Sequence, residues 1–178
     1  MKWNIDPSHS QIGFAVKHMM ISTVRGSFKT FQGTIETDDQ YRPTSIQVSI
    51  DASSVDTRDA QRDGHLRSAD FFNAENSQQL LFSSTNIQQT GDQSYQIQGN
   101  LTINGITRPV TLKAETTSTG KDPWGNTRIA AEATATINRE DWNITWNQAL
   151  EFGGVLVGKD VKLNLEVQAI QVQDPVLS

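Results

Sequence analysis

Along most of the chain, apolar and polar residues alternate with a period of two, which is typical of β-strands that bury one face. In the first such segment Ile12, Phe14 and Val16 form an apolar side that His18 continues. Strands do not alternate with long helices, so the pattern predicts an antiparallel sheet of about eight strands. The expected strands lie at residues 12–18, 25–36, 46–51, 80–89, 95–103, 110–114, 129–137 and 161–169.

Local signals predict how some of these strands bend and turn. Asn104 and Gly105 tolerate the positive φ angles of a two-residue turn, so they predict a tight hairpin. Pro109 lacks an N–H donor, which favours a strand end or a sheet edge. The three-residue spacing of Phe28 and Phe31 breaks the alternation and predicts a β-bulge within the second strand.

The segment 62–72 (RDGHLRSADFF) departs from the strand pattern, because it is rich in charge and ends in two phenylalanines. It lies in the longest connection between strands, where a short helix is expected around residues 56–68. Ser54 or Asp56 would cap the start of this helix, and Gly64 would end or loosen it. We interpret the segment as a cap over one side of whatever the strands enclose.

A sheet with one apolar face and no covering helical layer has to pack on itself, as a sandwich or a closed barrel. An eight-stranded barrel is wide enough to be filled by side chains or to hold one small ligand. Ala131, Ala133 and Ala135 occupy successive inward positions, so this wall leaves space unless large side chains reach across. The pattern leaves a solid core and an apolar cavity as alternatives, in a single domain over 1–173 with a tail at 174–178.

Composition and charge narrow the range of functions. The net charge of -5 and the lack of a Lys/Arg cluster argue against nucleic acid as a partner. Without cysteine, a disulfide, a thiolate metal site or a catalytic thiol is impossible. No apolar run approaches the ~20 residues of a membrane-spanning helix, and the N-terminus lacks the apolar core of a signal peptide. A cytoplasmic location is therefore expected for the chain as written, and a periplasmic one if it is a mature form.

Candidate catalytic and metal-binding groups are few. His9, His18 and His65 have no cysteine partners, and acidic residues are not clustered at metal-ligand spacing, so no metal site is expected. The chain has no G-x-S-x-G motif. Asp6, Ser8 and His9 have the residue types of a catalytic triad, but neighbours on a strand point to opposite faces and would not converge. We therefore expect no catalytic residue and no cofactor.

A series of motifs resembles the YceI-like family, described as polyisoprenoid-binding proteins with a lipocalin-like barrel. The resemblance runs nearly end to end, and the motifs follow one another in order. They are residues 3–10 (WNIDPSHS), 14–19 (FAVKHM), 24–28 (VRGSF), 31–33 (FQG), 53–57 (SSVDT), 62–72 (RDGHLRSADFF), 99–110 (GNLTINGITRPV), 137–139 (INR) and 157–161 (VGKDV). Residues 77–79 (SQQ) stand where members commonly have a Tyr-Pro pair, so the entry to the next strand is expected to differ.

The resemblance implies an elongated eight-stranded antiparallel barrel with an apolar tunnel. The tunnel would hold a long isoprenoid or fatty chain, often in a homodimer, for binding or transport rather than for a reaction. The expected contacts combine inward strand positions with the cap segment. For the apolar chain they are Phe14, Val16, His18, Met19, Phe28, Phe71, Phe72, Phe82, Leu101, Ile129, Ala131, Ala133, Trp142, Trp146 and Leu163, and for a polar head group they are Arg62, His65 and Arg67.

Three functions remain open at this level. The first is a carrier that holds a polyisoprenoid, an isoprenoid quinone or a fatty acid or amide for storage, transport or stress protection. The second is an enzyme that acts on such a lipid with His18 or His65 as the base. The third is a structural stress protein whose barrel is filled by its own side chains.

Overall fold

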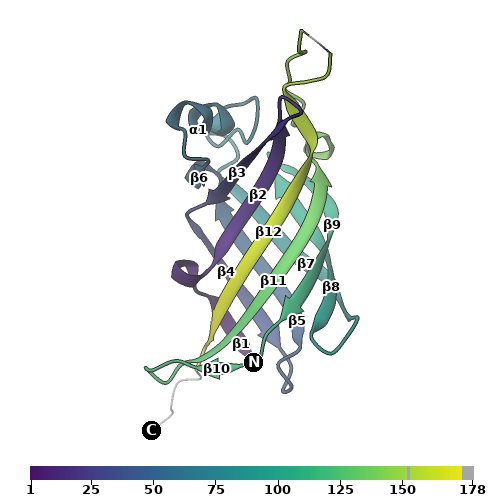
Figure 1. Ribbon diagram of the computed structural model, residues 1–178. Coiled ribbons are helices and arrows are strands. Elements are labelled where there is room, and N and C mark those ends of the chain that lie inside the picture. Colours follow the sequence, from purple (N-terminus) through teal and green to yellow (C-terminus); the bar gives the residue numbers. More distant parts are fainter. Residues whose placement is uncertain (152, 174–178) are drawn as a thin grey trace.

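The computed structural model describes residues 1–151 and 153–173, which form mainly antiparallel strands (Figure 1). The expected C-terminal tail, 174–178, lies outside the described residues. The helices are η1 Pro7–His9, η2 Ala52–Ser54, α1 Ala60–Arg67 and η3 Arg139–Trp142, where η marks a short 3-10 helix. The strands are β1 Lys2–Ile5, β2 Gln11–His18, β3 Ser22–Phe28, β4 Phe31–Thr37, β5 Pro43–Asp51, β6 Val55–Asp56, β7 Gln79–Gln89, β8 Ser94–Ile103, β9 Ile106–Thr116, β10 Gly120–Lys121, β11 Thr127–Asn138 and β12 Val157–Gln171.

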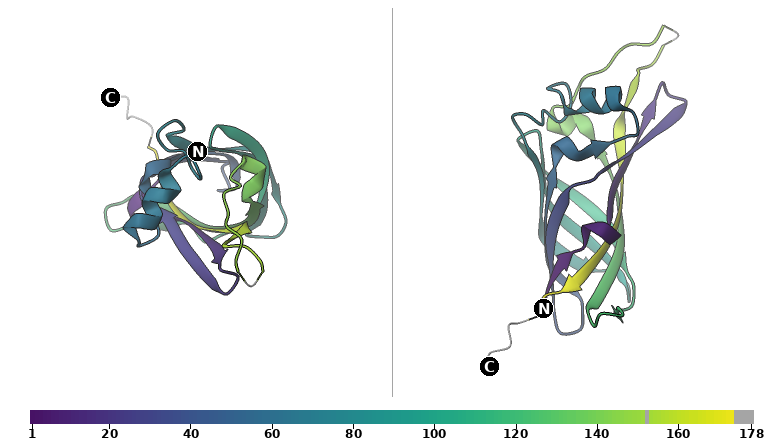
Figure 2. Two further views of the ribbon diagram at one scale, coloured as in Figure 1. Left: turned by 90° about the horizontal axis from the view of Figure 1, so that it is seen from above. Right: turned by 90° about the vertical axis from the view of Figure 1, so that its left-hand side faces the viewer.

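Strand β12 closes the sheet into a barrel because it pairs along both of its edges. Residues 160–170 pair with β11, while the other edge pairs with β2 over 157–166 and with β1 over 169–171. From β1 the ring continues through β4, β5, β7, β8 and β9 back to β11. Figure 2 shows the ring in the view from above. The expected eight-stranded antiparallel barrel is therefore confirmed.

Two of the barrel strands are interrupted. β1 and β2 both lie along β12 and are separated by η1, while β3 and β4 are separated by Lys29 and Thr30. β3 pairs with β2 and β4 pairs with β1, so the two interruptions lie side by side. The prediction of one strand with a bulge between Phe28 and Phe31 is therefore wrong. The two-residue break instead lets both phenylalanines point inward, where both are buried.

The predicted hairpin at Asn104 and Gly105 is confirmed. Ile103 pairs with Ile106, and the two turn residues have φ angles of 53° and 73°. A turn with two positive φ angles matches the twist of the strands that it joins. β9 pairs with β11 only over residues 113–116, and Pro109 lies outside this stretch. At Pro109, β9 therefore has β8 as its single partner strand, and the missing N–H is tolerated there.

The two ends of the barrel differ. At one end Trp3 is 0% exposed, and its indole N–H donates a hydrogen bond to Thr37 Oγ1 over 2.8 Å. We call this the closed end. At the other end α1 and η3 lie on two sides of the rim, and the loop after η3 projects beyond it (Figures 1 and 2). We call that end the mouth.

Helix α1 begins later than the sequence predicts. Asp59 caps it by accepting a hydrogen bond from the Arg62 N–H over 3.0 Å, so neither Ser54 nor Asp56 is the cap. Those two residues belong to η2 and β6, which precede the helix. Gly64 does not end the helix, because it lies inside the helix on an exposed face and the helix runs on past it.

Replacing Gly64 by alanine should raise the free energy of unfolding by about 0.5–1 kcal/mol, because alanine loses less conformational freedom than glycine in a helix. A Cβ atom at this position would have no heavy atom within 4 Å. Gly26→Ala is the matched comparison, since its Cβ would lie 2.5 Å from the Phe14 ring, and it should lower the free energy by about 1–3 kcal/mol. Urea unfolding followed by circular dichroism measures both changes. A Gly64→Ala protein less stable than the wild type would contradict the helix assignment.

Candidate functional site

The barrel encloses a cavity of about 360 Å³ whose wall is almost entirely apolar. Each of the long strands contributes inward side chains, and α1 and the loop after η3 complete the wall at the mouth. Most of the side chains predicted to contact a ligand are on this wall. They are Phe14, Val16, His18, Phe28, Arg62, His65, Phe71, Phe72, Phe82, Leu101, Ala131, Ala133, Trp142, Trp146 and Leu163.

Three predicted contacts lie away from the cavity wall. Met19 is in the turn between β2 and β3, where its side chain is 46% exposed. Ile129 points into the barrel, as the alternation along β11 predicts, but it lies nearer the closed end and packs against the core cluster around Trp3. Arg67, in the last turn of α1, is exposed, and its guanidinium is 3.5 Å from the Ser53 carbonyl. The alternation of side chains along the strands thus predicted which residues face the cavity but not where the cavity ends.

Small residues on two neighbouring strands account for part of the open space. Ala131 and Ala133 of β11 line the cavity, and Ala133 pairs with Ala114 of β9, which also lines it. Gly99 opens no such space, because the Phe82 ring covers it: a Cβ atom on Gly99 would lie 2.5 Å from that ring. The cavity is therefore wide beside β9 and β11 and filled beside β7 and β8 at Gly99.

A cavity of this size is too large to be an incidental packing defect. An enclosed, empty apolar void lowers stability by roughly 24 cal/mol per Å³, so a closed void of the same 360 Å³ would cost on the order of 9 kcal/mol. The stability of a whole domain is only about 5–15 kcal/mol. Sites for small molecules commonly measure roughly 300–1,000 Å³ and have apolar walls with a few polar groups. The volume and the lining fit a binding site for an apolar ligand.

The few polar side chains on the wall are all basic. His18 lies at the end of β2, Arg62 and His65 lie on α1, and Arg139 begins η3. Lys17 borders the cavity beside His18, but its ammonium is on the outer face, where it donates to Thr23 Oγ1. All five are at the mouth, and none of the described lining residues carries a carboxylate. A molecule with an apolar chain and one polar end would therefore meet hydrogen-bond donors at the mouth and only apolar groups farther in.

Arg139 is 5% exposed, and its guanidinium holds the mouth together. Nε donates to the Gly158 carbonyl and Nη1 to the Ile144 carbonyl, each over 2.8 Å, and Nη2 donates to the Val157 carbonyl over 3.3 Å. Burial lowers the pKa of Arg139, and the negative charge of Glu140 offsets part of this effect. These bonds tie η3 to its following loop and to β12. The alternating pattern of the sequence stops near Arg139, but no feature of the sequence indicated that Arg139 lines the cavity.

Arg62 lines the cavity with its guanidinium already bound to the protein. Nε donates to Thr57 Oγ1 over 2.7 Å, and Nη2 donates to the Thr57 carbonyl over 2.6 Å. The buried carboxylate of Asp63 accepts hydrogen bonds from the N–H and the hydroxyl of the same threonine. This cluster fastens α1 to the end of β6, so Arg62 positions the helix, and its contact with a head group stays a prediction.

His65 links α1 to the loop after η3. Its ring lies edge-on to Trp146, with 4.6 Å between ring centroids, and edge-on to Phe71 at 5.0 Å. Its Nε2 lies 2.9 Å from Asp70 Oδ2, so an exposed carboxylate orients the imidazole. The segment that we expected to act as a cap therefore lies on the rim, where Trp146 meets it from the other side of the mouth.

Comparison with known proteins assigns the chain to a family. Residues 3–169 match the model of the YceI-like domain. The chain belongs to the YceI-like family. It is 40% identical to Protein YceI of Salmonella newport over 165 residues, which cover 92% of this chain and 82% of the relative.

Solved structures share the YceI-like barrel. The crystal structure of BcnA from Burkholderia cenocepacia matches with a TM-score of 0.80 and 23% identity, over 92% of this chain and 98% of that chain. A domain from Saccharophagus degradans, described as polyisoprenoid-binding and implicated in plant cell wall breakdown, matches with a TM-score of 0.70 and 15% identity, over 96% of this chain and 98% of that chain. At these identities the likeness establishes the fold alone.

Other kinds of site were sought in the described part of this YceI-like chain. Across residues 1–151 and 153–173, no group of three His, Asp or Glu side chains is arranged to hold a metal ion. No helix within the same ranges is long and apolar enough to cross a bilayer. One further cluster of nucleophilic and charged groups lies at the closed end of the barrel.

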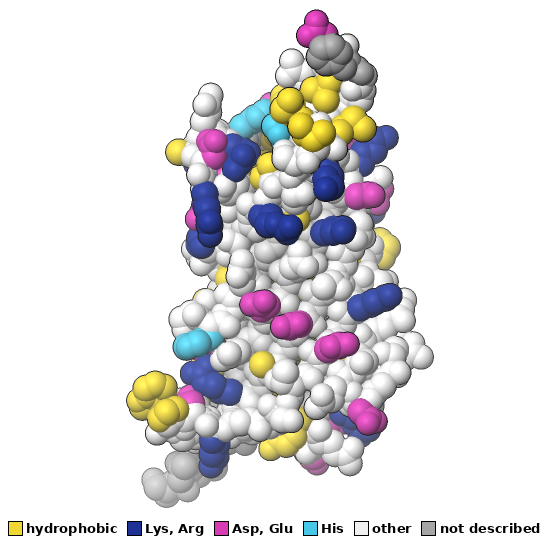
Figure 3. All heavy atoms as spheres, in the orientation of Figure 1, with side chains coloured by type: hydrophobic (Ala, Val, Ile, Leu, Met, Phe, Trp, Pro, Cys, Tyr) yellow, Lys and Arg dark blue, Asp and Glu magenta, His cyan; other side chains and the backbone are white. Residues whose placement is uncertain are grey.

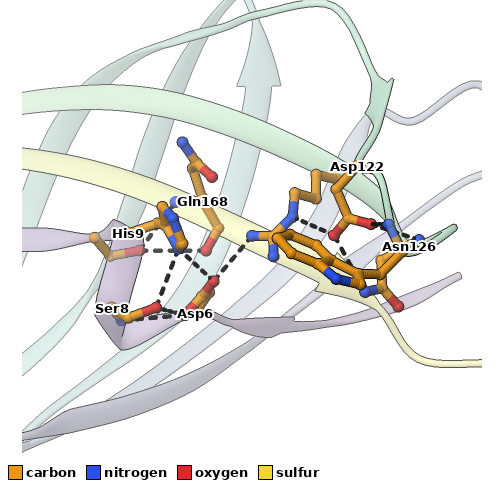
Figure 4. Close-up of polar contacts among 9 residues, drawn as sticks. Asp6, Ser8, His9, Asp122, Asn126 and Gln168 are labelled. Carbon is orange, nitrogen blue, oxygen red and sulfur yellow. Dashed lines mark hydrogen bonds and ion pairs between the residues drawn. The ribbon is translucent and has the colours of Figure 1, made fainter.

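Asp6, Ser8 and His9 converge, contrary to the sequence prediction, because residues 7–9 form the 3-10 turn η1 rather than a strand (Figure 4). The Ser8 hydroxyl donates to Asp6 Oδ1 over 2.7 Å, and His9 Nδ1 lies 2.9 Å from Asp6 Oδ2. Ser8 Oγ also lies 3.0 Å from His9 Nδ1, so one ring nitrogen faces both the serine and Asp6. In a catalytic triad the serine and the carboxylate meet different nitrogens of the histidine. The three residues therefore cap a turn and do not form a catalytic triad.

Arg128 joins this turn to the β10–β11 hairpin through Asp6 and Asp122, which Figure 4 labels. Its Nη1 donates to Asp6 Oδ2 over 2.9 Å, and its Nε donates to Asp122 Oδ2 over 2.8 Å. Hydrogen bonds from Arg128 and Ser8 hold the pKa of Asp6 well below its usual range, although burial opposes them. Burial acts to raise the pKa of Asp122, but hydrogen bonds from Arg128 and Asn126 outweigh it and lower the pKa to about 2.

Arg128→Gln should lower the free energy of unfolding near neutral pH and make it depend less on pH. Both carboxylates have a lowered pKa in the folded state, so their contribution to stability is complete above the unfolded value of about 3.9 and is lost as the pH falls towards about 2. The difference in unfolding free energy between wild type and variant should therefore be largest above about pH 4 and should shrink towards about pH 2.

Urea unfolding at a series of pH values measures this difference. Arg42→Gln is the control, because Arg42 pairs with Asp38 on the exposed surface, where such pairs contribute little. A difference for Arg128→Gln that stays constant from neutral pH down to about pH 2 would show that the two carboxylates do not depend on Arg128.

Proposed function

We propose that the protein binds a long apolar lipid in the barrel cavity and releases it unchanged. The lipid is a polyisoprenoid, an isoprenoid quinone, or a fatty acid or amide, and the role is its storage, transport or protection under stress. The observation that carries the proposal is a cavity of about 360 Å³ with an apolar wall and with polar groups only at its mouth. Membership of the YceI-like family and the description of the Saccharophagus degradans domain as polyisoprenoid-binding support this class of ligand.

The proposed ligand lies with its chain inside and its polar end at the mouth. Of the three predicted head-group contacts, Arg62 is bonded to Thr57 and Arg67 points away, which leaves His65 as the best placed. His18 lies on the same part of the wall. Imidazoles favour an end group that exchanges hydrogen bonds with them, such as a carbonyl, a hydroxyl or a carboxylate.

Binding without reaction is supported by the chemistry of the wall. A general base has to lie within hydrogen-bond reach of the group that it deprotonates, and a covalent mechanism needs a nucleophile beside that base. His65 is directed at Asp70, and no serine or threonine is among the described residues that line the cavity. The wall is thus suited to holding a lipid rather than to cleaving or transferring part of it.

Native mass spectrometry of the protein purified from its expression host tests the proposal. Bound lipid should appear as a mass increment that organic solvent removes, and the stripped protein should take up added polyprenol or ubiquinone. Lipid recovered after long incubation should be chemically unchanged. A product that wild type forms and that His18→Ala and His65→Ala do not form would indicate an enzyme instead. A barrel that carries no lipid and takes up none when it is offered would refute the proposal.

Ala133→Phe should block lipid uptake, because the added ring projects from β11 into the cavity beside Ala114. The space already exists, so the free energy of unfolding should fall by no more than about 1–2 kcal/mol. Thr134→Phe is the control, since this adjacent side chain is exposed on the outer face and its replacement should leave uptake unchanged. Titration with polyprenol followed by native mass spectrometry compares the two variants. Uptake that survives Ala133→Phe would mean that the lipid binds elsewhere.

A further inference from the structure

Four apolar side chains are exposed beside the mouth. Met19, Met20 and Ile21, in the turn between β2 and β3, are 46%, 63% and 83% exposed, and Val155, in the loop before β12, is 38% exposed. Figure 3 shows hydrophobic side chains gathered at this end of the molecule, next to histidine. We call these four residues the lip. Single exposed apolar residues are common on protein surfaces, but a group of them at the entrance of a cavity indicates an interaction surface.

The lip continues the wall of the cavity onto the outside of the protein. The Met19 N–H donates to the Leu156 carbonyl over 2.7 Å, so the turn and the loop are joined. Leu156 and Val157, which follow directly after Val155, line the cavity. Val157 also pairs with His18 at the end of β2. An apolar molecule that leaves the cavity here therefore passes directly over the lip.

The backbone of the lip is poorly suited to the side chains that it carries. Met19 and Met20 have φ angles of 53° and 62°, in the left-handed region that glycine and asparagine tolerate best. The β8–β9 turn has the same kind of geometry and carries Asn104 and Gly105. Because the two methionines are largely exposed, burial within the protein does not offset this strain. Contact with something outside the chain would explain why both positions are apolar.

Basic side chains form a band on the outer face behind the lip. Arg25 of β3 and Lys162 of β12 lie on either side of Ala15 of β2, and Lys17 is two residues closer to the mouth. Arg25, Lys162 and Lys17 form no ion pair with any other residue that the structure describes. This basic band is free to pair with negative charges outside the protein.

One group of acidic side chains on this face lies farther from the mouth than the basic band, while Asp160 of β12 and Glu140, which pairs with Lys159, lie near the mouth. Glu132 of β11 pairs with Glu166 of β12 and with Glu115 of β9, so three carboxylates form one row across the barrel. In Figure 3 most of the side chains in the upper part of the visible face are basic, with some acidic ones among them, and a row of acidic ones crosses the middle. Glu151, in the loop beside the lip, offsets only part of the basic band. A negatively charged surface would thus attract the mouth and repel the rest of this face.

We infer that the lip and the basic band dock the mouth of the barrel onto the surface of an anionic lipid bilayer. The inference rests on the proposed function, because a long apolar chain would pass from the bilayer to the cavity without crossing water when the mouth lies against the membrane. Apolar side chains that enter the interface, together with basic ones that pair with lipid phosphates, are the features that bind a protein to such a surface.

A second copy of the chain fits the same surface less well. A two-fold contact through the lip would bring the basic band of one copy close to the basic band of the other, and like charges repel. A stable interface also buries roughly 800 Å² per partner, which four partly exposed side chains do not supply. A bilayer needs neither a matching shape nor a large contact area.

Co-sedimentation of the full chain with vesicles tests the docking. The wild type should bind vesicles of phosphatidylcholine with about one quarter phosphatidylglycerol more tightly than pure phosphatidylcholine vesicles, and added salt should weaken this binding. Met20→Asn with Ile21→Asn removes two apolar side chains without changing the charge, and it should weaken binding about tenfold or more. Arg25→Gln with Lys162→Gln should weaken binding to the anionic vesicles by a similar factor and leave binding to neutral vesicles unchanged.

Trp124→Asn is the matched control, because Trp124 is 80% exposed in the turn that Asp122 holds at the closed end, and its loss should not change vesicle binding. Vesicle binding that depends on Trp124 would overturn the inference. The inference would also be overturned if the Met20→Asn and Ile21→Asn variant changed its oligomeric state, measured by light scattering, but bound vesicles as well as the wild type. Uptake of detergent-dispersed polyprenol without vesicles reports the proposed function separately. Normal uptake without vesicle binding would refute the docking alone, and absent uptake would refute the proposed function.

Discussion

The pairing of β12 along both edges is the interaction on which the rest of the structure depends. Its contacts with β11 on one side, and with β2 and β1 on the other, turn an open sheet into a ring. Once eight strands close, the number of strands sets the width of the interior, and the side chains fill that width or leave it open. Here large rings such as Trp3 fill one end, while Ala133 and Ala114 lie side by side on the inner face of β11 and β9. The cavity is thus a consequence of ring closure combined with short inward side chains.

Much of the fold could be predicted because the direction of side chains along a strand has a strict period of two. That period located the long strands and their inward faces, and the chemistry of Asn104 and Gly105 located one hairpin. The pattern failed where the backbone is irregular. A bulge and a two-residue break at Lys29 and Thr30 both bring Phe28 and Phe31 to the same face, so spacing alone does not separate them. Several residues before α1 are able to cap a helix, and the use of Asp59 depends on how β6 pairs with β3.

Less of the candidate site could be predicted, because its limits depend on contacts between distant parts of the chain. The alternation of side chains correctly placed Ile129 on the inner face of β11. The side chain does not reach the cavity, because it packs against the core cluster that contains Trp3 of β1. Arg62 and Arg67 lie on one short helix, and the bond from Arg62 to Thr57 decides which of them turns towards the cavity. The bond between Asp6 and Arg128 joins residues 122 positions apart. No local pattern contains information of this kind.

The burial of Trp3 has a further consequence for any lipid held in the barrel. Because side chains are packed at that end, a long chain that enters at the mouth would do so with its apolar tip first and would leave with its polar end first. The depth between the mouth and the Trp3 ring then limits how much of the chain can be enclosed. A longer chain has to fold back on itself or leave its last segment outside. The barrel would therefore select its ligands by length, with the core cluster around Trp3 as the limit.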